Sequence, residues 1–190
     1  MKKKFRLLLS SLVVTAFLFC SGLNANGQVF DQGDKVLSLG IGLGSNYIGW
    51  GTYYKTTVPP IWIAGDYCLR EDLGPGNLGV GALIGFSSYK YDYTVLDYGF
   101  KSTTIFFGAR GTYHFVDLVD KLDLYGGIFL GGKIHTYNDF GGYDLTHDAS
   151  FQVASDFFAG ARYYFSDNFA VVGELGYGIA WFKIGVSLKF

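Results

Sequence analysis

The sequence predicts an all-β chain folded as an eight-stranded antiparallel up-and-down transmembrane β-barrel. The closing residues 181–190 alternate apolar and polar side chains and end in an aromatic residue, Phe190. The same alternation recurs in seven earlier segments, and the connections between segments alternate between short and long. An even number of such segments with connections of alternating length is typical of outer-membrane barrels.

The chain opens with a segment typical of a secretory signal. Four basic residues among the first six positions precede an apolar stretch at residues 7–19. This stretch is shorter than the roughly 20 residues of a membrane-spanning helix. Because Ala25 and Gly27 are small, residues 1–27 are expected to be a removed signal peptide and residues 28–190 the barrel. The alternative is a lipoprotein acylated at Cys20, against which the bulky residues 17–19 argue.

Charge and cysteine content narrow the class of protein. Removal of the signal leaves eleven basic and sixteen acidic residues, a formal net charge of −5. This balance does not favour nucleic acid, which requires a basic face. Cys68 would be the only remaining cysteine, which excludes a disulfide framework. The mature length of about 160 residues fits one domain.

The eight segments can be placed in order along the chain. Strands are expected at residues 36–44, 61–70, 78–89, 103–115, 122–134, 151–165, 169–178 and 181–190. Most reach the roughly 9–11 residues with which a tilted strand crosses the hydrocarbon layer. Short connections are expected at 71–76, 116–121 and 166–168, and long ones at 45–60, 90–101 and 136–149. The last hairpin is expected to be tight around Ile179 and Ala180.

In each segment one set of alternate positions is apolar, and the other carries glycines and most charges. A soluble barrel of the lipocalin type would place the charged set outside, so the periodicity alone leaves both barrels open. Aromatic residues near the segment ends favour the membrane, because aromatic girdles mark both membrane interfaces. We expect one girdle of Tyr67, Tyr113, Phe115, Tyr163, Phe165 and Phe190, and a second of Tyr47, Trp50, Tyr89 and Trp181.

In architecture the chain resembles small outer-membrane barrels of the OmpA/OmpX type, within the outer membrane beta-barrel protein families of Gram-negative bacteria. The resemblance covers residues 28–190 and rests on the closing strand 181–190 and on two Gly-Ala-Arg motifs, at 108–110 and 160–162. It implies localisation in the bacterial outer membrane, surrounded by outer-membrane lipid. It also implies that the barrel-assembly machinery reads Phe190 during biogenesis.

An eight-stranded barrel encloses a lumen just wide enough for side chains to fill. Counting hairpin partners places Glu174 opposite Gly160 and diagonal to Arg162 and Lys183. Diagonal neighbours lie about 7–8 Å apart, within reach of long side chains. We therefore expect a lumen ionic cluster that either holds the strands in register or lines a narrow ion path. Its expected members are Glu174, Arg162, Lys183, Asp66 and Arg110.

The sequence offers little for catalysis or metal binding. Glycines at residues 40–44 precede no helix, so they are strand glycines rather than a dinucleotide loop. His114 is expected to face the lumen, and His135 and His147 flank an acidic connection whose spacing matches no known metal motif. Ser150 with His147 and Asp148 is the one candidate set for a lipid-modifying hydrolase. We expect no enzyme activity, no cofactor and no resident metal.

The long connections combine many tyrosines with small polar residues. This composition is typical of recognition surfaces, although it also fits an extended wall with aromatic anchors at the headgroups. The sequence thus predicts a non-enzymatic, monomeric outer-membrane protein, a structural envelope component whose loops contact an extracellular partner. The alternative is a narrow channel or conduit for small or hydrophobic molecules, resembling OmpW-like barrels.

Overall fold

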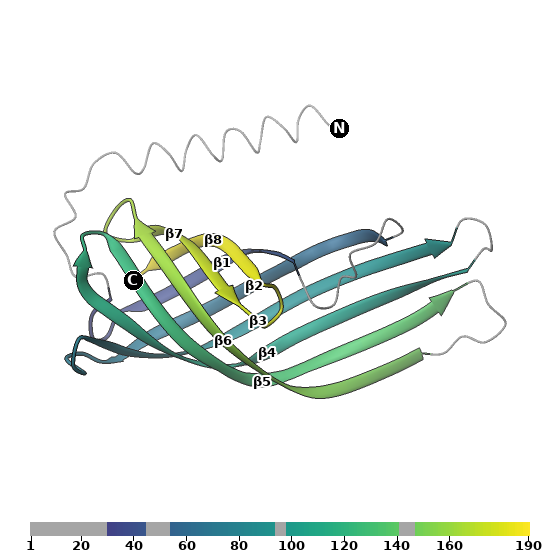
Figure 1. Ribbon diagram of the computed structural model, residues 1–190, viewed down its shortest axis with the longest axis horizontal. Helices are drawn as coiled ribbons and strands as arrows, with labels where there is room; N and C mark the ends of the chain where they lie inside the picture. Colours follow the sequence, from purple (N-terminus) through teal and green to yellow (C-terminus); the bar gives the residue numbers. More distant parts are fainter. Residues whose placement is uncertain (1–29, 45–53, 94–97, 141–146) are drawn as a thin grey trace, which may run out of the picture.

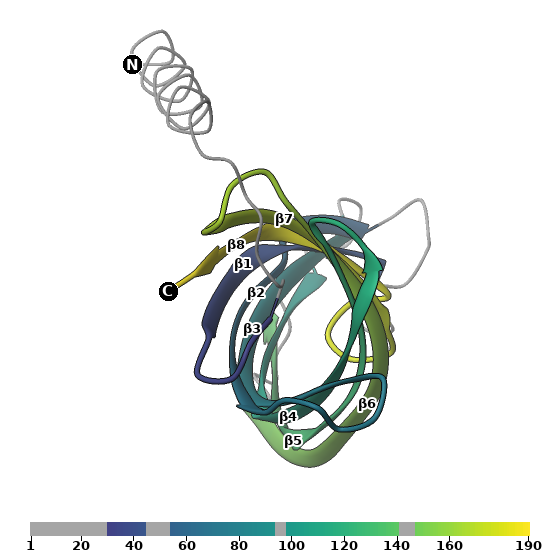
Figure 2. The same cartoon turned by 90° about the vertical axis from the view of Figure 1, so that its left-hand side faces the viewer.

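The computed structural model describes residues 30–44, 54–93, 98–140 and 147–190. Its strands form one closed antiparallel barrel in which each strand pairs with its neighbours in sequence and β1 pairs with β8 (Figures 1 and 2). The predicted fold class is confirmed. The strands are β1 (Lys35–Leu43), β2 (Tyr54–Arg70), β3 (Gly76–Tyr93), β4 (Tyr98–Val119), β5 (Leu122–Phe140), β6 (His147–Tyr164), β7 (Phe169–Gly176) and β8 (Phe182–Lys189).

The outer surface of the barrel is apolar and the interior is polar. On β1 the leucines and isoleucine at 37, 39, 41 and 43 are exposed, whereas Asp66, Arg162 and Glu174 of other strands are buried. A lipocalin-type barrel requires the opposite placement, so this arrangement excludes the soluble alternative. In the parts of the chain that the structure describes, no helix is long and apolar enough to cross a membrane.

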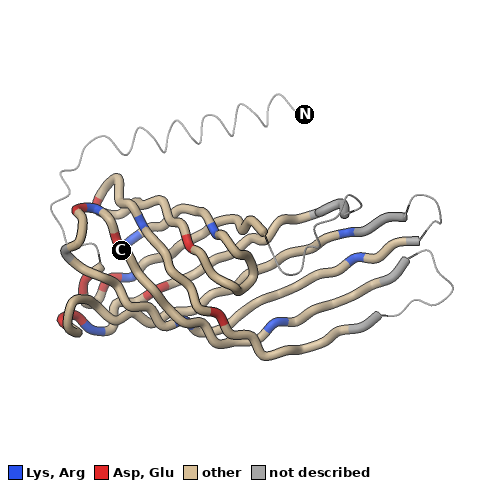
Figure 3. Tube along the Cα trace, in the orientation of Figure 1, with Lys and Arg blue, Asp and Glu red and all other residues tan. Residues whose placement is uncertain are grey.

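The two ends of the barrel differ in their connections. One end, called here the short-turn end, carries the turns after β2, β4 and β6 and the last residue, Phe190. Figure 3 shows most charged residues concentrated at this end, near the label C. The opposite end, called the long-loop end, carries the connections that include residues 45–53, 94–97 and 141–146, which lie outside the described residues.

The strands differ strongly in length. β1, β7 and β8 have 9, 8 and 8 residues, whereas β2 to β6 have 17 to 22 residues and continue further toward the long-loop end (Figure 1). The expected long connections at 45–60, 90–101 and 136–149 are therefore too long, because residues 54–60, 90–93, 98–101, 136–140 and 147–149 belong to strands. The sequence pattern ended the strands where apolar residues give way to Ser, Thr and Lys, but hairpin pairing continues past that point.

Two consecutive prolines lie in the extended part of β2. Pro59 and Pro60 fall where the pairing of β2 with β3 shifts register between Thr56 and Ile61. Among the described residues, the pairing of β1 with β2 extends no further than Ile61, so this stretch of β2 has no described strand partner on that side. A proline is tolerated there because a missing N–H on an edge or a bulge removes no ladder hydrogen bond.

The aromatic girdle predicted at the short-turn end is present. Tyr113 packs edge-on against Phe115 with ring centroids 5.3 Å apart, and Tyr163 against Phe165 at 5.2 Å. At the other end Trp181 is 40% exposed, and Tyr47 and Trp50 fall outside the described residues. The placement of Tyr89 in the second girdle was wrong. It lies on the same face of β3 as the buried Leu83, and its ring contacts the inward-facing Phe100.

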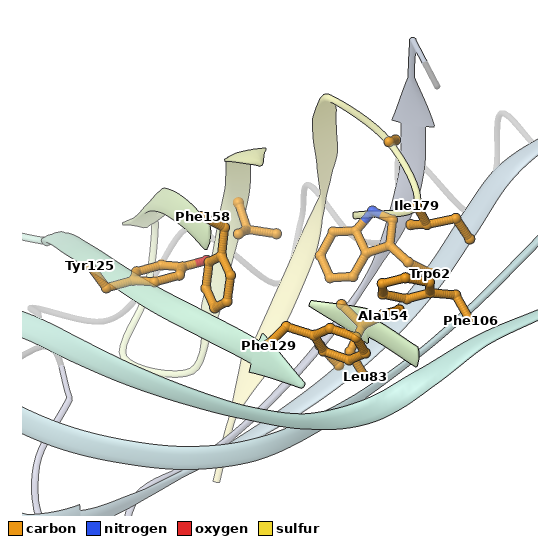
Figure 4. Packing of buried hydrophobic residues seen from close by; sticks show 11 residues of the cluster. Trp62, Leu83, Phe106, Tyr125, Phe129, Ala154, Phe158 and Ile179 are labelled. Atoms are coloured by element: carbon orange, nitrogen blue, oxygen red, sulfur yellow. The ribbon is translucent and has the colours of Figure 1, made fainter. Parts of the chain in front are cut away.

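The part of the lumen nearer the long-loop end is packed with aromatic residues. Trp62, Phe106, Phe129 and Phe158 form a buried cluster that Figure 4 shows from close by. Phe106 and Phe129 stack with centroids 4.5 Å apart. Glycines leave room for these rings; for example, a Cβ on Gly127 would lie 2.4 Å from Phe158.

The prediction of a tight hairpin between β7 and β8 is wrong, because the connection comprises the five residues 177–181. It folds inward: Ile179 is buried beside Trp62 in the aromatic cluster (Figure 4), and Ala180 is buried in the same cluster. The backbone N–H of Tyr177 donates to Oδ1 of Asp156, which holds the start of the hairpin. This hairpin therefore covers the lumen toward the long-loop end.

Candidate functional site in the lumen

The structure brings the five predicted cluster residues into one continuous network. Arg110 Nη2 lies 2.6 Å from Glu174 Oε1, and Arg110 Nε lies 3.1 Å from Asp66 Oδ1. Lys183 Nζ lies 2.7 Å from the second oxygen of Glu174. Arg162 pairs with Asp66 through Nη2. None of these side chains is more than 2% exposed.

Strand pairing determines which residues of β6 and β8 lie beside Glu174 on β7. Glu174 lies opposite Gly160, as predicted, so Arg162 is diagonal to it. Lys183, however, is directly opposite Glu174 rather than diagonal, because the five-residue hairpin shifts the pairing of β7 with β8. The ion pairs of Arg162 go to Asp66 and to Asp123, so Arg162 joins Glu174 through Asp66 and Arg110.

The network crosses the lumen rather than running along one wall. Asp66 is on β2 and Arg162 on β6, four strands apart in a ring of eight. The pair of Arg110 on β4 with Glu174 on β7 takes a second path across the interior. Side chains that join opposite walls occupy the cross-section through which an ion would have to pass.

His114 faces the lumen, as expected, but the sequence interpretation missed that it belongs to a second polar layer beside this network. Arg162 Nη1 lies 3.2 Å from Oδ2 of Asp123, whose Oδ1 lies 2.7 Å from Nδ1 of His114. His114 Nε2 lies 2.9 Å from the Thr112 hydroxyl, and Tyr125 OH donates to Glu174 Oε1 at 2.7 Å. Asp123 shares its strand face with Tyr125, and this alternation was the available signal.

The charges within the network balance. Arg110, Arg162 and Lys183 provide three positive charges, against three negative charges on Asp66, Asp123 and Glu174. Aromatic faces add to the compensation. The guanidinium carbon of Arg162 lies 4.5 Å from the centroid of Tyr125, and that of Arg110 lies 4.3 Å from the centroid of Phe158. Buried charges are tolerated when they are paired in this way.

Phe190 closes the barrel seam through its backbone. Its N–H donates to the carbonyl of Lys35 at 2.9 Å, and its own carbonyl accepts from the Lys35 N–H at 3.0 Å. The residue is 68% exposed. Phe190 is thus bonded at the seam between β1 and β8, and its side chain lies on the outer surface.

The other candidate residues form no site in the described parts of the chain. Both ring nitrogens of His135 lie within hydrogen-bonding distance of hydroxyls, of Ser102 at 3.2 Å and of Thr104 at 3.0 Å. Ser150 is exposed on β6, whereas the side chains of His147 and Asp148 lie outside the described residues. Among described residues, no group of three or more His, Cys, Asp or Glu side chains is placed to hold a metal ion.

A closed ring of eight antiparallel strands, apolar outside and ionic inside, defines a small transmembrane β-barrel. In a comparison with solved structures the chain is similar to Ail, the attachment invasion locus protein of Yersinia pestis, in a complex with the heparin analogue sucrose octasulfate. The TM-score is 0.55 at 13% identity, over 84% of this chain and 100% of Ail. This likeness confirms the expected fold, that of the small outer-membrane barrels.

The chain is also similar to the N-terminal β-barrel domain of Pseudomonas aeruginosa OprF, with a TM-score of 0.46 at 18% identity, over 84% of this chain and 98% of that domain. No model of a known protein family matches the sequence, and no curated protein matches it either.

Proposed function

We propose that this protein is a non-enzymatic, monomeric barrel of the bacterial outer membrane, whose projecting strands and loops contact a partner outside the cell. The observation that carries this proposal is the difference in strand length. β2 to β6 continue past the ends of β1, β7 and β8 toward the long-loop end, which is more sheet than the membrane requires. With the long-loop end outside the cell, the short-turn end faces the periplasm.

The side chains on the projecting strands support a contact role. Phe100 stacks on Tyr137 with centroids 4.9 Å apart and meets Tyr89 edge-on at 6.1 Å. These rings join β3, β4 and β5 on one face. Tyrosine offers large contact area with little loss of side-chain freedom. The similar barrel Ail is an attachment protein by name, which is consistent with such a role here.

A binding assay tests the contact role. Cells that display the wild-type protein would be applied to surfaces coated with heparin, with a neutral polysaccharide or with a host matrix protein. A variant with Phe100→Ser and Tyr137→Ser should lose most binding, whereas Phe115→Ser at the short-turn end should keep it. Equal binding of cells with and without the protein on every surface would refute the contact role.

The alternative function, a narrow channel or conduit, has one observation in its favour. The lumen is covered toward the long-loop end by the hairpin 177–181, which is a connection and not part of the paired wall, so a conduit would open by displacement of this hairpin. Single-channel recordings of the protein in planar bilayers decide between the two functions. We expect no stable conductance, because ion pairs cross the lumen. A stable, charge-selective conductance that Glu174→Gln alters would establish the conduit instead.

The remaining parts of the proposal concern biogenesis. Residues 1–27 are proposed to be cleaved during export, and Phe190 is proposed to be read by the barrel-assembly machinery. The exposed Phe190 ring is consistent with recognition by a partner. The amino-terminal sequence of the protein purified from outer membranes tests the cleavage site; a mature chain that begins at Cys20 would show a lipoprotein instead.

A further inference from the structure

The short-turn end of the lumen is closed by a residue that belongs to no strand. Phe30 precedes the first residue of β1, Lys35, yet it is only 1% exposed. Its ring stacks on His114 with centroids 3.9 Å apart and packs with Val36 and Cys68. Phe30 therefore lies inside the mouth of the barrel, on top of the polar layer of the lumen.

The barrel wall provides a fitted pocket for this residue. Gly79 leaves space for the ring, since a Cβ at that position would lie 3.1 Å from Phe30 Cε1. The Phe30 carbonyl accepts a hydrogen bond from Asn77 Nδ2 at 2.6 Å and a weak one from the Cys68 thiol at 3.8 Å. Shape and hydrogen bonding thus both position Phe30, and both come from β2 and β3.

A short turn links Phe30 to the wall. Gly33 has a φ of +94°, which favours glycine, and its N–H donates to the Cys68 carbonyl at 3.1 Å. The Asp34 carbonyl accepts from the Cys68 N–H at 2.9 Å, and the Asp34 carboxylate lies 3.3 Å from Lys189 Nζ. The segment from Phe30 to Asp34 is therefore held at its base by β2 and β8.

The polar layer beneath Phe30 does not depend on it for hydrogen bonds. Both nitrogens of His114 are within hydrogen-bonding distance of groups on the barrel wall, Asp123 and Thr112. On its other face His114 stacks on Tyr125 at 4.9 Å. If Phe30 leaves its pocket about a hinge at Asp34, these contacts persist. The hydrogen bonds lost are those that residues 30–33 make with Asn77, Cys68 and Glu71. Phe30 can thus be released while the ionic network remains intact.

We propose that Phe30 is a releasable plug: the pocket of Val36, Cys68, Asn77, Gly79 and His114 is a binding site whose ligand is the chain's own Phe30. Release of Phe30 opens the short-turn end of the lumen and exposes the Cys68 thiol, which is otherwise 0% exposed. The base of the segment at Asp34 acts as the hinge. This inference depends on the fold and does not depend on the proposed contact role.

Cys68 is a built-in reporter of the plug. Protein purified from membranes in detergent would be treated with N-ethylmaleimide, and modification of the Cys68 peptide would be followed by mass spectrometry. Wild-type protein should react slowly compared with the urea-unfolded chain. Phe30→Ala should raise the rate by about a hundredfold, because loss of a buried aromatic side chain favours the open state. Phe115→Ala, which removes an exposed ring at the same end, should leave the rate unchanged.

Heat-modifiable migration on a gel shows whether each variant is folded. If Phe30→Ala is folded and reacts no faster than wild type, the wall rather than Phe30 shields Cys68, and the plug proposal is wrong. If Phe30→Ala does not fold, Phe30→Leu takes its place: a folded Leu variant with a faster reaction supports the plug, and one with the wild-type rate overturns it. Fast modification of the wild-type protein would likewise overturn it.

Discussion

Asp66 on β2 and Arg162 on β6 form an ion pair that joins opposite walls of the barrel. Neither side chain has measurable exposure to solvent. Each also pairs with a second partner, Asp66 with Arg110 and Arg162 with Asp123. The pair therefore lies at the centre of a network that ties β2, β4, β5, β6, β7 and β8 together in the barrel interior.

Replacement of Arg162 by methionine should strongly destabilise the barrel. The change leaves the carboxylates of Asp66 and Asp123 buried with fewer partners, and breaking a buried ion pair from one side costs about 3–5 kcal/mol. Urea titration of the protein in lipid vesicles measures this loss. The control is Arg70→Met, which changes the same residue type at an exposed position on β2 and should cost less than about 0.5 kcal/mol. Similar losses for both variants would mean that the network does not stabilise the barrel.

A charge on the outer apolar surface should be costly only if that surface faces lipid. Phe157 is 79% exposed on β6, so Phe157→Arg would be harmless in a soluble protein. In a bilayer a cation near the midplane of a barrel costs about 2–4 kcal/mol. The folded fraction in lipid vesicles, read from heat-modifiable migration, should fall for Phe157→Arg. Ser150→Arg, on the same strand toward the long-loop end, should fold like wild type; equal folding of both variants would argue against a lipid-facing band at Phe157.

Glycine at the barrel seam should resist substitution. A Cβ on Gly40 would lie 2.1 Å from the carbonyl oxygen of Ile184 on β8, whereas a Cβ on Gly65 would meet nothing within 4 Å. Gly40→Ala therefore forces β1 away from β8 and should cost about 1–3 kcal/mol, the usual cost of overpacking. Gly65→Ala is the matched control and should leave the urea midpoint nearly unchanged. The idea fails if the two variants unfold at the same urea concentration.

Phe190→Ser should separate assembly in the cell from folding in vitro. The backbone bonds of residue 190 to Lys35 do not require an aromatic side chain, so refolding into vesicles should proceed as in wild type. Recognition of the ring during biogenesis would be lost, so the amount in the outer membrane should fall while periplasmic chains accumulate. Cell fractionation with quantitative immunoblotting measures both pools. Normal outer-membrane levels of the variant would show that Phe190 is not part of the assembly signal.

The alternation of residue types sufficed to predict the barrel, and the aromatic residues near the segment ends were needed to predict that its apolar face points outward. Charges and glycines occupy one set of positions on nearly every strand, so Glu174, Arg162 and Asp66 were placed in the lumen together. Pairing across a short turn is nearly determined by sequence, which is why Gly160 was correctly placed opposite Glu174. Contacts between strands that are distant around the ring, such as Asp66 with Arg162, require the closed geometry.

The positions of residues that depart from regular strand pairing could not be predicted from the alternation of apolar and polar residues. Phe30 precedes all strands, and nothing in its neighbourhood of polar residues indicates that its ring enters the lumen. Ile179 and Ala180 looked like a tight turn, because an inward-folded hairpin and a tight one share the same small and apolar composition. Strand ends toward the long-loop end were missed because outside a membrane a strand no longer needs apolar residues.

The unequal strands give the molecule a direction within the plane of the membrane. On one side, over β7, β8 and β1, the described strands end soon after the apolar surface does; on the other, β3 to β5 rise as a continuous wall. A neighbouring membrane protein would meet a low rim or a tall sheet depending on its side of approach. Lateral packing in a crowded membrane would therefore favour some rotational orientations of this barrel over others. A cylinder of equal strands would have no such preference.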